Sequence, residues 1–166
     1  MTVSEWRSII ARDIAANKGY PKSVVILLAL RTAQFVRSQP GLLARIAYLP
    51  VGSVYKLLSE WILGVEIPAS TQIGAGLQIR HGVGIVLNPF SVIGEDVMLR
   101  HGVTLGNRLA DDDCPVIGDG VEFGAGATVI GRVTIGDHAR IGAGAVVVKD
   151  VPAGGVAYAP PTVIRG

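Results

Sequence analysis

The chain has 166 residues, 49% of them hydrophobic, only 5% aromatic, and 22 of them glycine, so it can form one domain whose core consists of small stacked units rather than large rings. Its net charge of +2 is too small to predict nucleic-acid binding. The single cysteine, Cys114, excludes an internal disulfide, and because no signal peptide is visible in residues 1–16 we expect a cytoplasmic protein.

Residues 1–64 have apolar side chains at helical spacing. We predict helices over residues 3–18 with Ser4 as N-cap, over residues 22–37 before Pro40, and over residues 42–63 with an interruption near Pro50. Residues 1–64 are therefore predicted to form a small helical region. This region is mildly basic, and its apolar helices are compatible with peripheral contact at the inner face of the membrane. Its longest apolar stretch, residues 23–30, is far shorter than the ~20 residues of a membrane span.

After residue 64 the apolar residues recur every six positions, a step that fits neither a helix nor a lone strand. A sustained step of six is typical of a hexapeptide β-helix, in which each repeat contributes a short strand and a turn. We therefore predict a β-helix domain over residues 65–166. A loop over residues 106–116 should leave it, since this stretch contains three consecutive acids. The repeat positions are Ile67, Ile73, Ile79 and Ile85, then Ile93, Leu99 and Leu105, then Ile117, Phe123, Val129, Ile135, Ile141 and Val147.

Two of the three histidines lie in a repeated tetrapeptide. Arg80-His81-Gly82-Val83 returns further along the chain as Arg100-His101-Gly102-Val103. Three hexapeptides make one coil, and we place an insertion of two residues between Ile85 and Ile93. On this interpretation His81 and His101 occupy the same position in successive coils, separated by the strand spacing of ~4.8 Å.

Five segments together make the chain similar to a known family. It resembles the serine acetyltransferase group of hexapeptide acyltransferases, and within that group the exopolysaccharide branch, such as the colanic acid biosynthesis acetyltransferases. The His segment followed by a loop is the most specific part of this resemblance. The segments are RDIAANKG (12–19), ALRTAQF (29–35), GVEIPASTQIGAGLQIRHGVGIVLN (64–88), RHGVTLGNR (100–108) and CPVIGDGVEFGAGATVIG (114–131).

The resemblance implies an all-β left-handed parallel β-helix that assembles as a homotrimer, with acetyl-CoA as co-substrate between neighbouring prisms and no metal. It also implies that His81 is the general base and that Glu66 orients it. Four small residues and one basic residue match the family's CoA contacts. These are Ala125, Gly126, Arg140, Ala143 and Gly144.

The chain departs from true serine acetyltransferases where those enzymes hold the amino acid. Arg80 replaces an acid before the catalytic histidine, and Asp113-Cys114 replaces an Arg-His pair that holds the carboxylate. These inversions disfavour the serine zwitterion, although Asp13 matches an acid that helps to hold serine. A neutral sugar hydroxyl needs only hydrogen-bonding groups. We therefore assign Asp13, Arg80, His101, Asn107 and Asp113 to the acceptor site.

These observations predict an acetyl-CoA-dependent O-acetyltransferase that acts on a sugar or lipid-linked saccharide in exopolysaccharide or capsule biosynthesis. Neutral imidazole suits a general base because its unperturbed pKa of ~6.5 lies near working pH. The alternatives are a serine O-acetyltransferase of cysteine biosynthesis and a non-catalytic β-helix scaffold. A prism-shaped metalloenzyme would need three converging histidines, whereas His138 is expected on another face.

Overall fold

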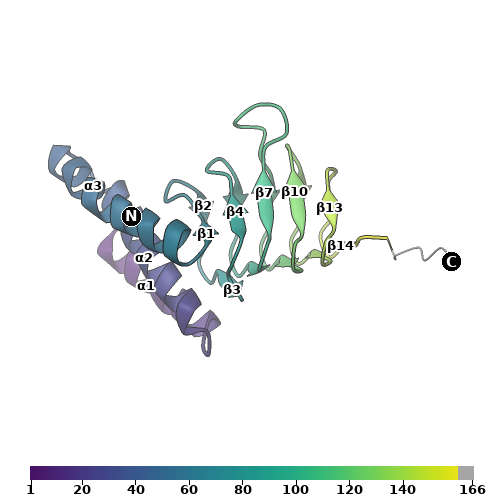
Figure 1. Ribbon diagram of the computed structural model, residues 1–166, viewed down its shortest axis with the longest axis horizontal. Helices are drawn as coiled ribbons and strands as arrows, with labels where there is room; N and C mark the ends of the chain where they lie inside the picture. The colour runs from purple at the N-terminus through teal and green to yellow at the C-terminus, as the bar shows by residue number, and fades with distance from the viewer. Residues whose placement is uncertain (161–166) are drawn as a thin grey trace.

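The computed structural model describes residues 1–160, which form a helical region and a three-sided prism stacked end to end (Figure 1). Residues 161–166, the end of the predicted β-helix domain, lie outside the described part. No helix within residues 1–160 has the length and hydropathy needed to cross a bilayer. The helices are α1 (Val3–Ala16), α2 (Pro21–Ser38), α3 (Leu42–Lys56) and the π-helical turn η1 (Leu57–Ile62).

Two details of the helices differ from the sequence prediction. The N-cap of α1 is Thr2 rather than Ser4, because Thr2 and Glu5 form a reciprocal capping box. Helix α3 also continues through Pro50 instead of breaking there. Pro50 lies on the exposed side of the helix, where water can satisfy the carbonyl that loses its intrahelical donor.

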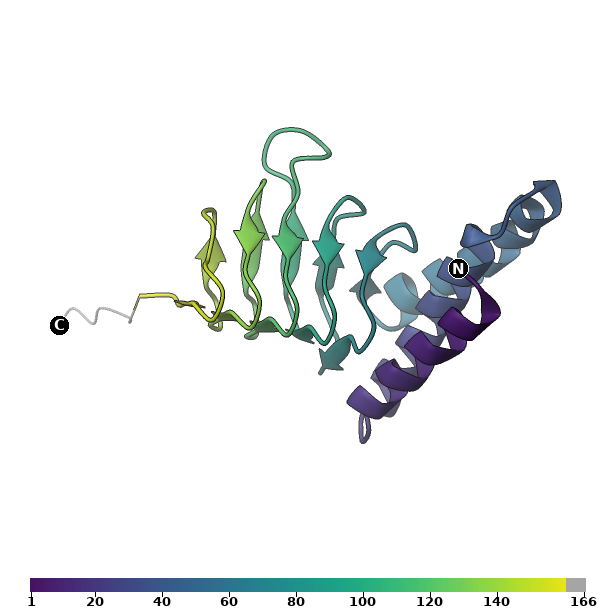
Figure 2. The ribbon, with the colours of Figure 1, turned by 180° about the vertical axis from the view of Figure 1, so that it is seen from behind.

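The prism has three faces, each a parallel sheet (Figures 1 and 2). The first sheet contains β1 (Val65–Glu66), β4 (Ile85–Leu87), β7 (Thr104–Gly106), β10 (Thr128–Ile130) and β13 (Val146–Val147). The second contains β2 (Gln72–Ile73), β5 (Val92–Ile93), β8 (Val116–Ile117) and β11 (Thr134–Ile135). The third contains β3 (Gln78–Arg80), β6 (Met98–Arg100), β9 (Glu122–Phe123), β12 (Arg140–Ile141) and β14 (Val156–Ala157).

The core of the prism consists of the repeat residues that the sequence marked. Ile79, Leu99, Leu105, Phe123 and Val129 are fully buried. Successive coils bury one apolar residue above another, so the prediction of a left-handed parallel β-helix after a helical region is confirmed. The segment between β7 and β8 stands out beyond the other turns (Figure 2).

The strand register places the two-residue insertion elsewhere than predicted. Ile79 on β3 pairs with Leu99, which is 20 residues later, whereas Leu87 on β4 pairs with Leu105, which is only 18 residues later. One coil is thus two residues longer when it is counted from β3 than when it is counted from β4. The two extra residues therefore lie between β3 and β4, and the prediction of an insertion between Ile85 and Ile93 is wrong. The spacing of six from Ile79 to Ile85 does not mark equivalent repeat positions, because Ile85 is aligned with Val103 of the next coil and Leu87 is aligned with Leu105.

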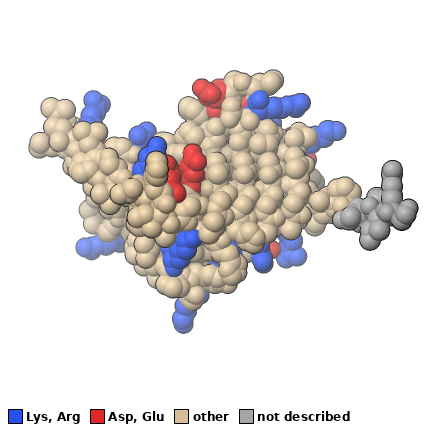
Figure 3. Space-filling view, in the orientation of Figure 1, with Lys and Arg blue, Asp and Glu red and all other residues tan. Residues whose placement is uncertain are grey.

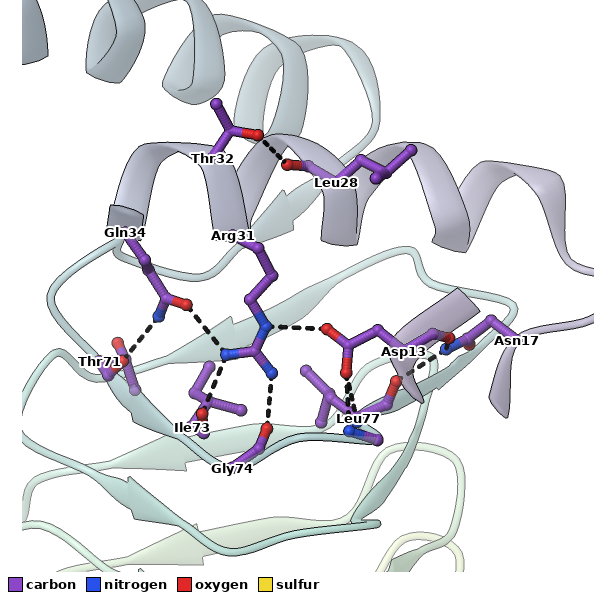
Figure 4. A network of polar contacts seen from close by, with 11 residues as sticks. Asp13, Asn17, Leu28, Arg31, Thr32, Gln34, Thr71, Ile73, Gly74 and Leu77 are labelled. Carbon is purple, nitrogen blue, oxygen red and sulfur yellow. Dashed lines mark hydrogen bonds and ion pairs between the residues drawn. The ribbon is translucent and has the colours of Figure 1, made fainter. Parts of the chain in front are cut away.

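A buried polar network fastens the helices to the first coil (Figure 4). Asp13 on α1 accepts a hydrogen bond from Nε of Arg31 on α2 at 2.8 Å, and both side chains are almost wholly buried. Asp13 also accepts from the backbone N–H groups of Gly76 and Leu77 at 2.7 and 3.1 Å. Arg31 donates in addition to the carbonyl of Ile73 at 2.9 Å. The network fixes the position of the helices beside the first coil.

Candidate active site

One corner of the prism, between the third and the first sheet, collects most of the predicted site residues. At this corner the N–H groups of Gly102, Gly126 and Gly144 donate to the carbonyls of the preceding coil, each at 2.9 Å. All three glycines have φ between +66° and +70°, a conformation that side chains disfavour. The acceptor carbonyls belong to Val83, His101 and Ala125. His101, Ala125 and Ala143 thus form one row, which we call the corner row, with Val83 at its start.

His81 lies beside the corner row rather than in it. His81 and His101 leave the third sheet at the same point of successive coils, as predicted, because Arg80 pairs in register with Arg100. The two extra residues that follow His81 nevertheless make Val83, rather than His81, the residue whose carbonyl accepts from Gly102 in the corner row. His81 has φ +57° and opens the wider turn that the two extra residues create. A Cβ at Gly82 would collide with Cγ2 of Ile79, so glycine is required there.

The wide turn brings the two imidazoles edge to face. The ring centroids of His81 and His101 are 6.4 Å apart with an interplanar angle of 74°. The ring of Tyr20, at the start of α2, is 5.9 Å from that of His81, also edge-on. Both histidines are exposed in the single chain, so an incoming molecule can reach them. Sequence reasoning missed Tyr20, which has no motif of its own.

Backbone donors are available along the corner row. Within residues 1–160, the N–H groups of Ala125 and Ala143 have no hydrogen-bond acceptor. At the equivalent position of the corner between the second and third sheets, Glu95 donates to Oδ1 of Asp119 at 2.7 Å, and the Asp119 N–H donates to Oδ1 of Asp137 at 2.9 Å. The corner row lacks such carboxylates, and its amides are therefore free to bind polar groups of a ligand.

Arg80 is held against the helices. Its guanidinium lies 4.3 Å from the ring centroid of Tyr20, and it donates to the carbonyl of Ala16 at 3.0 Å and to Oε1 of Gln78 at 2.8 Å. The stacking and these bonds position Tyr20 next to His81. Its Nη1 is buried without a partner among the described residues, and the acceptor-binding role of Arg80 stays a prediction.

Asp13 does not lie at the corner. It is 1% exposed, and both of its oxygens are occupied by Arg31, Gly76 and Leu77. An acceptor cannot reach it without unfolding this contact. The structure therefore corrects the sequence prediction and gives Asp13 a structural role.

Two further predicted residues, Glu66 and Arg140, lie on strands that flank the corner row. Glu66 on β1 is exposed and pairs in register with Val86, and no hydrogen bond among the described residues joins it to His81. Arg140 on β12 is an exposed neighbour of Glu122, at 3.8 Å. Arg140 precedes Ala143 of the corner row by three residues in the sequence.

Asn107 and Asp113 belong to the protruding loop, which begins at the C-terminal end of β7, whereas His101 lies before the N-terminal end of the same strand. Asn107 accepts a hydrogen bond from Asn88 at 3.2 Å, and Asp113 accepts one from the N–H of Arg132 at 2.7 Å. In a single chain the loop is thus anchored to neighbouring coils and separated from the histidines by the width of the sheet.

Cys114 is not part of a nucleophilic site. Burial, together with the nearby charges of Asp111, Asp112 and Asp113, raises the pKa of its thiol. The thiol donates to the carbonyl of Asp111 at 3.3 Å. A buried thiol that stays protonated is a poor nucleophile.

Comparison with known proteins decides the family. A family model described as bacterial transferase hexapeptide (six repeats) matches residues 114–149. A protein of Escherichia coli K12 described as a putative colanic acid biosynthesis acetyltransferase, WcaB, is 39% identical over 126 residues, which are 74% of this chain and 78% of that protein. The chain belongs to the serine acetyltransferase-like hexapeptide-repeat acyltransferases. It is an acetyltransferase of the serine acetyltransferase and WcaB type.

Other relatives of this acetyltransferase are serine acetyltransferases. That of Helicobacter pylori 26695 is 38% identical over 102 residues, 60% of each chain. The solved soybean serine acetyltransferase apoenzyme has a TM-score of 0.79 and 33% identity over 94% of this chain and 67% of that one. The Brucella abortus serine acetyltransferase in complex with coenzyme A has a TM-score of 0.81 and 27% identity over 96% of this chain and 67% of that one. These acetyltransferases and the coenzyme A complex together point to acetyl-CoA as the co-substrate.

Proposed function

We propose that this acetyltransferase moves an acetyl group from acetyl-CoA directly to a sugar hydroxyl of an exopolysaccharide or capsule precursor. The observation that carries the proposal is the corner row, which begins beside His81, contains His101 and continues over the next two coils with the free N–H groups of Ala125 and Ala143. A base and a line of backbone donors along one edge are what acyl transfer from a long thioester substrate requires.

The corner row has the features needed to hold acetyl-CoA. Beyond Gly126 and Gly144, no heavy atom of the described residues lies within 4 Å of where a Cβ would be. The backbone is therefore open to close approach by the pantetheine chain, and the N–H groups of Ala125 and Ala143 can bind its amides. Arg140, exposed on the adjacent strand, supplies a positive charge for the phosphates.

In this mechanism His81 takes the proton from the acceptor hydroxyl as the oxygen attacks the thioester carbonyl. The same imidazolium returns the proton to the sulfur as the carbon–sulfur bond breaks, so CoA leaves as a thiol. A positioned base contributes roughly 10²–10⁴-fold to the rate. Glu66 orients His81 once the substrates are bound, and His101 contacts the acceptor beside it.

We assign a sugar as the acceptor because the charged side chains that could bind a serine zwitterion are either engaged by other residues or have the wrong sign. Asp13 is buried with Arg31, Arg80 is engaged by Ala16 and Gln78, and Asp113 carries the wrong sign for a carboxylate. A neutral hydroxyl needs none of these partners. The 39% identity to the protein described as a putative colanic acid biosynthesis acetyltransferase also supports a saccharide acceptor.

The site is best completed by a homotrimer in the cytoplasm. In one chain the loop carrying Asn107 and the corner carrying His81 lie at opposite edges of the first sheet. Packing of prisms side by side would bring the loop of one subunit to the corner of the next, where Asn107 and Asp113 could bind the acceptor. We place the trimer at the inner face of the membrane, where a lipid-linked saccharide would be within its reach.

An acceptor screen tests the proposal. The purified enzyme is given acetyl-CoA with L-serine, nucleotide sugars or lipid-linked oligosaccharides, and CoA release is measured. We expect release with a saccharide and none above background with L-serine. Preferred turnover of L-serine would contradict the sugar assignment and support the serine acetyltransferase alternative. Failure to bind acetyl-CoA in calorimetry would support a non-catalytic scaffold.

A further inference from the structure

The outer side of α3 and the adjoining η1 expose several large apolar side chains. Leu42, Leu43, Ile46 and Leu49 are 71%, 84%, 53% and 66% exposed, and Trp61 in η1 is 79% exposed. The opposite side of α3 packs inward through Tyr55, whose hydroxyl donates to the carbonyl of Ile67. Leaving so many large side chains in water is unfavourable, and large exposed apolar patches usually mark an interaction site.

An apolar groove between α2 and α3 adjoins this surface. It has a volume of about 510 Å³, and Thr32 and Tyr55 are the only lining residues with polar side chains. The other lining residues are Val25, Leu28, Ala29, Pro50, Val51, Val54 and Leu58. Together with the exposed residues of α3 it forms what we call the α3 surface.

The charges around the α3 surface are mostly positive. Helices α2 and α3 with η1 expose Arg37, Arg45 and Lys56, and they contain one acid, Glu60, which pairs with Lys56 at 3.6 Å. Arg45 lies three residues after Leu42 and four before Leu49, at the edge of the apolar face. In Figure 3 the end of the helical region away from the prism shows blue atoms among tan, without red.

We infer that the α3 surface docks on a membrane containing anionic phospholipids. A helix with apolar residues on one side, cations at its border and an exposed Trp is typical of helices that lie in the membrane interface. Anionic headgroups attract the cations, whereas a second copy of the same surface would bring like charges together. The inference deepens the proposed function and rests on it for the acceptor, because a lipid-linked saccharide would be presented at this surface.

Vesicle binding tests the inference without any acceptor. A Trp6→Phe variant leaves Trp61 as the single tryptophan. We expect its emission to shift to the blue with vesicles of phosphatidylethanolamine and phosphatidylglycerol, and to stay unchanged with phosphatidylcholine. Ile46→Gln with Leu49→Gln should lower vesicle co-sedimentation at least tenfold. The matched control Leu109→Gln, 88% exposed in the protruding loop, should bind like the unchanged protein. Arg45→Gln and Lys56→Gln should each lower binding about fivefold.

Three results would overturn the inference. These are absence of binding to anionic vesicles, equal binding to neutral ones, and a larger assembly in light scattering that Ile46→Gln with Leu49→Gln dissolves without any vesicle binding. A His81→Asn variant should bind vesicles normally, so failure of docking and failure of the proposed catalysis are measured separately.

Discussion

Replacing Asp13 by Asn removes the charge of one partner from a buried ion pair. The side chain keeps an oxygen that can accept from Gly76 and Leu77, but it presents an amide instead of a carboxylate oxygen to Nε of Arg31, which lies 2.8 Å away. Arg31 is 1% exposed, so its charge cannot return to water without breaking the contact between helices and prism. Leaving one buried charge unpaired costs about 3–5 kcal/mol.

We therefore expect Asp13→Asn to lower the free energy of unfolding by about 3–5 kcal/mol, measured by urea denaturation at one fixed protein concentration, because subunit association also contributes. The matched control is Glu95→Gln. Glu95 also accepts from an arginine, Arg12, at 2.8 Å, but the two side chains are 54% and 41% exposed. Water and salt screen this pair, so the control should change stability far less.

The same variant distinguishes a structural role from a substrate role. Folded Asp13→Asn protein, assayed well below its unfolding temperature, should keep the KM for the acceptor. A stable Asp13→Asn protein with a greatly raised acceptor KM would refute the reasoning, because it would mean that the carboxylate contacts substrate.

His81→Asn should lower kcat roughly 10²–10⁴-fold with acetyl-CoA binding retained in calorimetry, because Asn tolerates φ +57°; near-normal turnover would contradict the base assignment. His101→Asn should raise the acceptor KM more than it lowers kcat, whereas a loss of kcat equal to that of His81→Asn would exchange their roles. Gly126→Ala and Gly154→Ala share φ +68° and open space, so both should lose a similar amount of stability, about 1–2 kcal/mol, but only Gly126→Ala should raise the KM for acetyl-CoA. Cys114 should react with a thiol reagent at pH 8 far more slowly in the folded protein than in urea, since its raised pKa keeps the thiol protonated; equal rates would show that it is accessible.

The fold could be predicted from the sequence because each coil repeats the same local requirements. An apolar residue every six positions from Ile93 to Leu105 and from Ile117 to Val147 corresponds to the buried interior. The capping box of Thr2 and Glu5 has a visible sequence pattern, T-x-x-E, which identifies Thr2 rather than Ser4 as the N-cap. The path of α3 through Pro50 could not be predicted, because it depends on which side of the helix faces water.

The site was harder to predict wherever register or distant partners decide it. The spacing of six between Ile79 and Ile85 concealed the wide turn at His81, which appears only when β4 is seen to pair with β7. Asp13 likewise has partners 18 to 64 residues away, and nothing in its local sequence distinguishes a buried anchor from a ligand of the substrate.

The wide turn gives the two histidines different surroundings although their sequences match. His101 is held in the corner row, where its carbonyl accepts from Gly126, so its backbone has a fixed place in the regular stack. His81 lies outside the stack, and its ring touches Tyr20, which Arg80 in turn holds against α1. The buried pair of Asp13 and Arg31 fixes those helices to the first coil. The position of the proposed base thus depends on the helical region as well as on the prism, and loosening that contact should reduce turnover even where the corner row is intact.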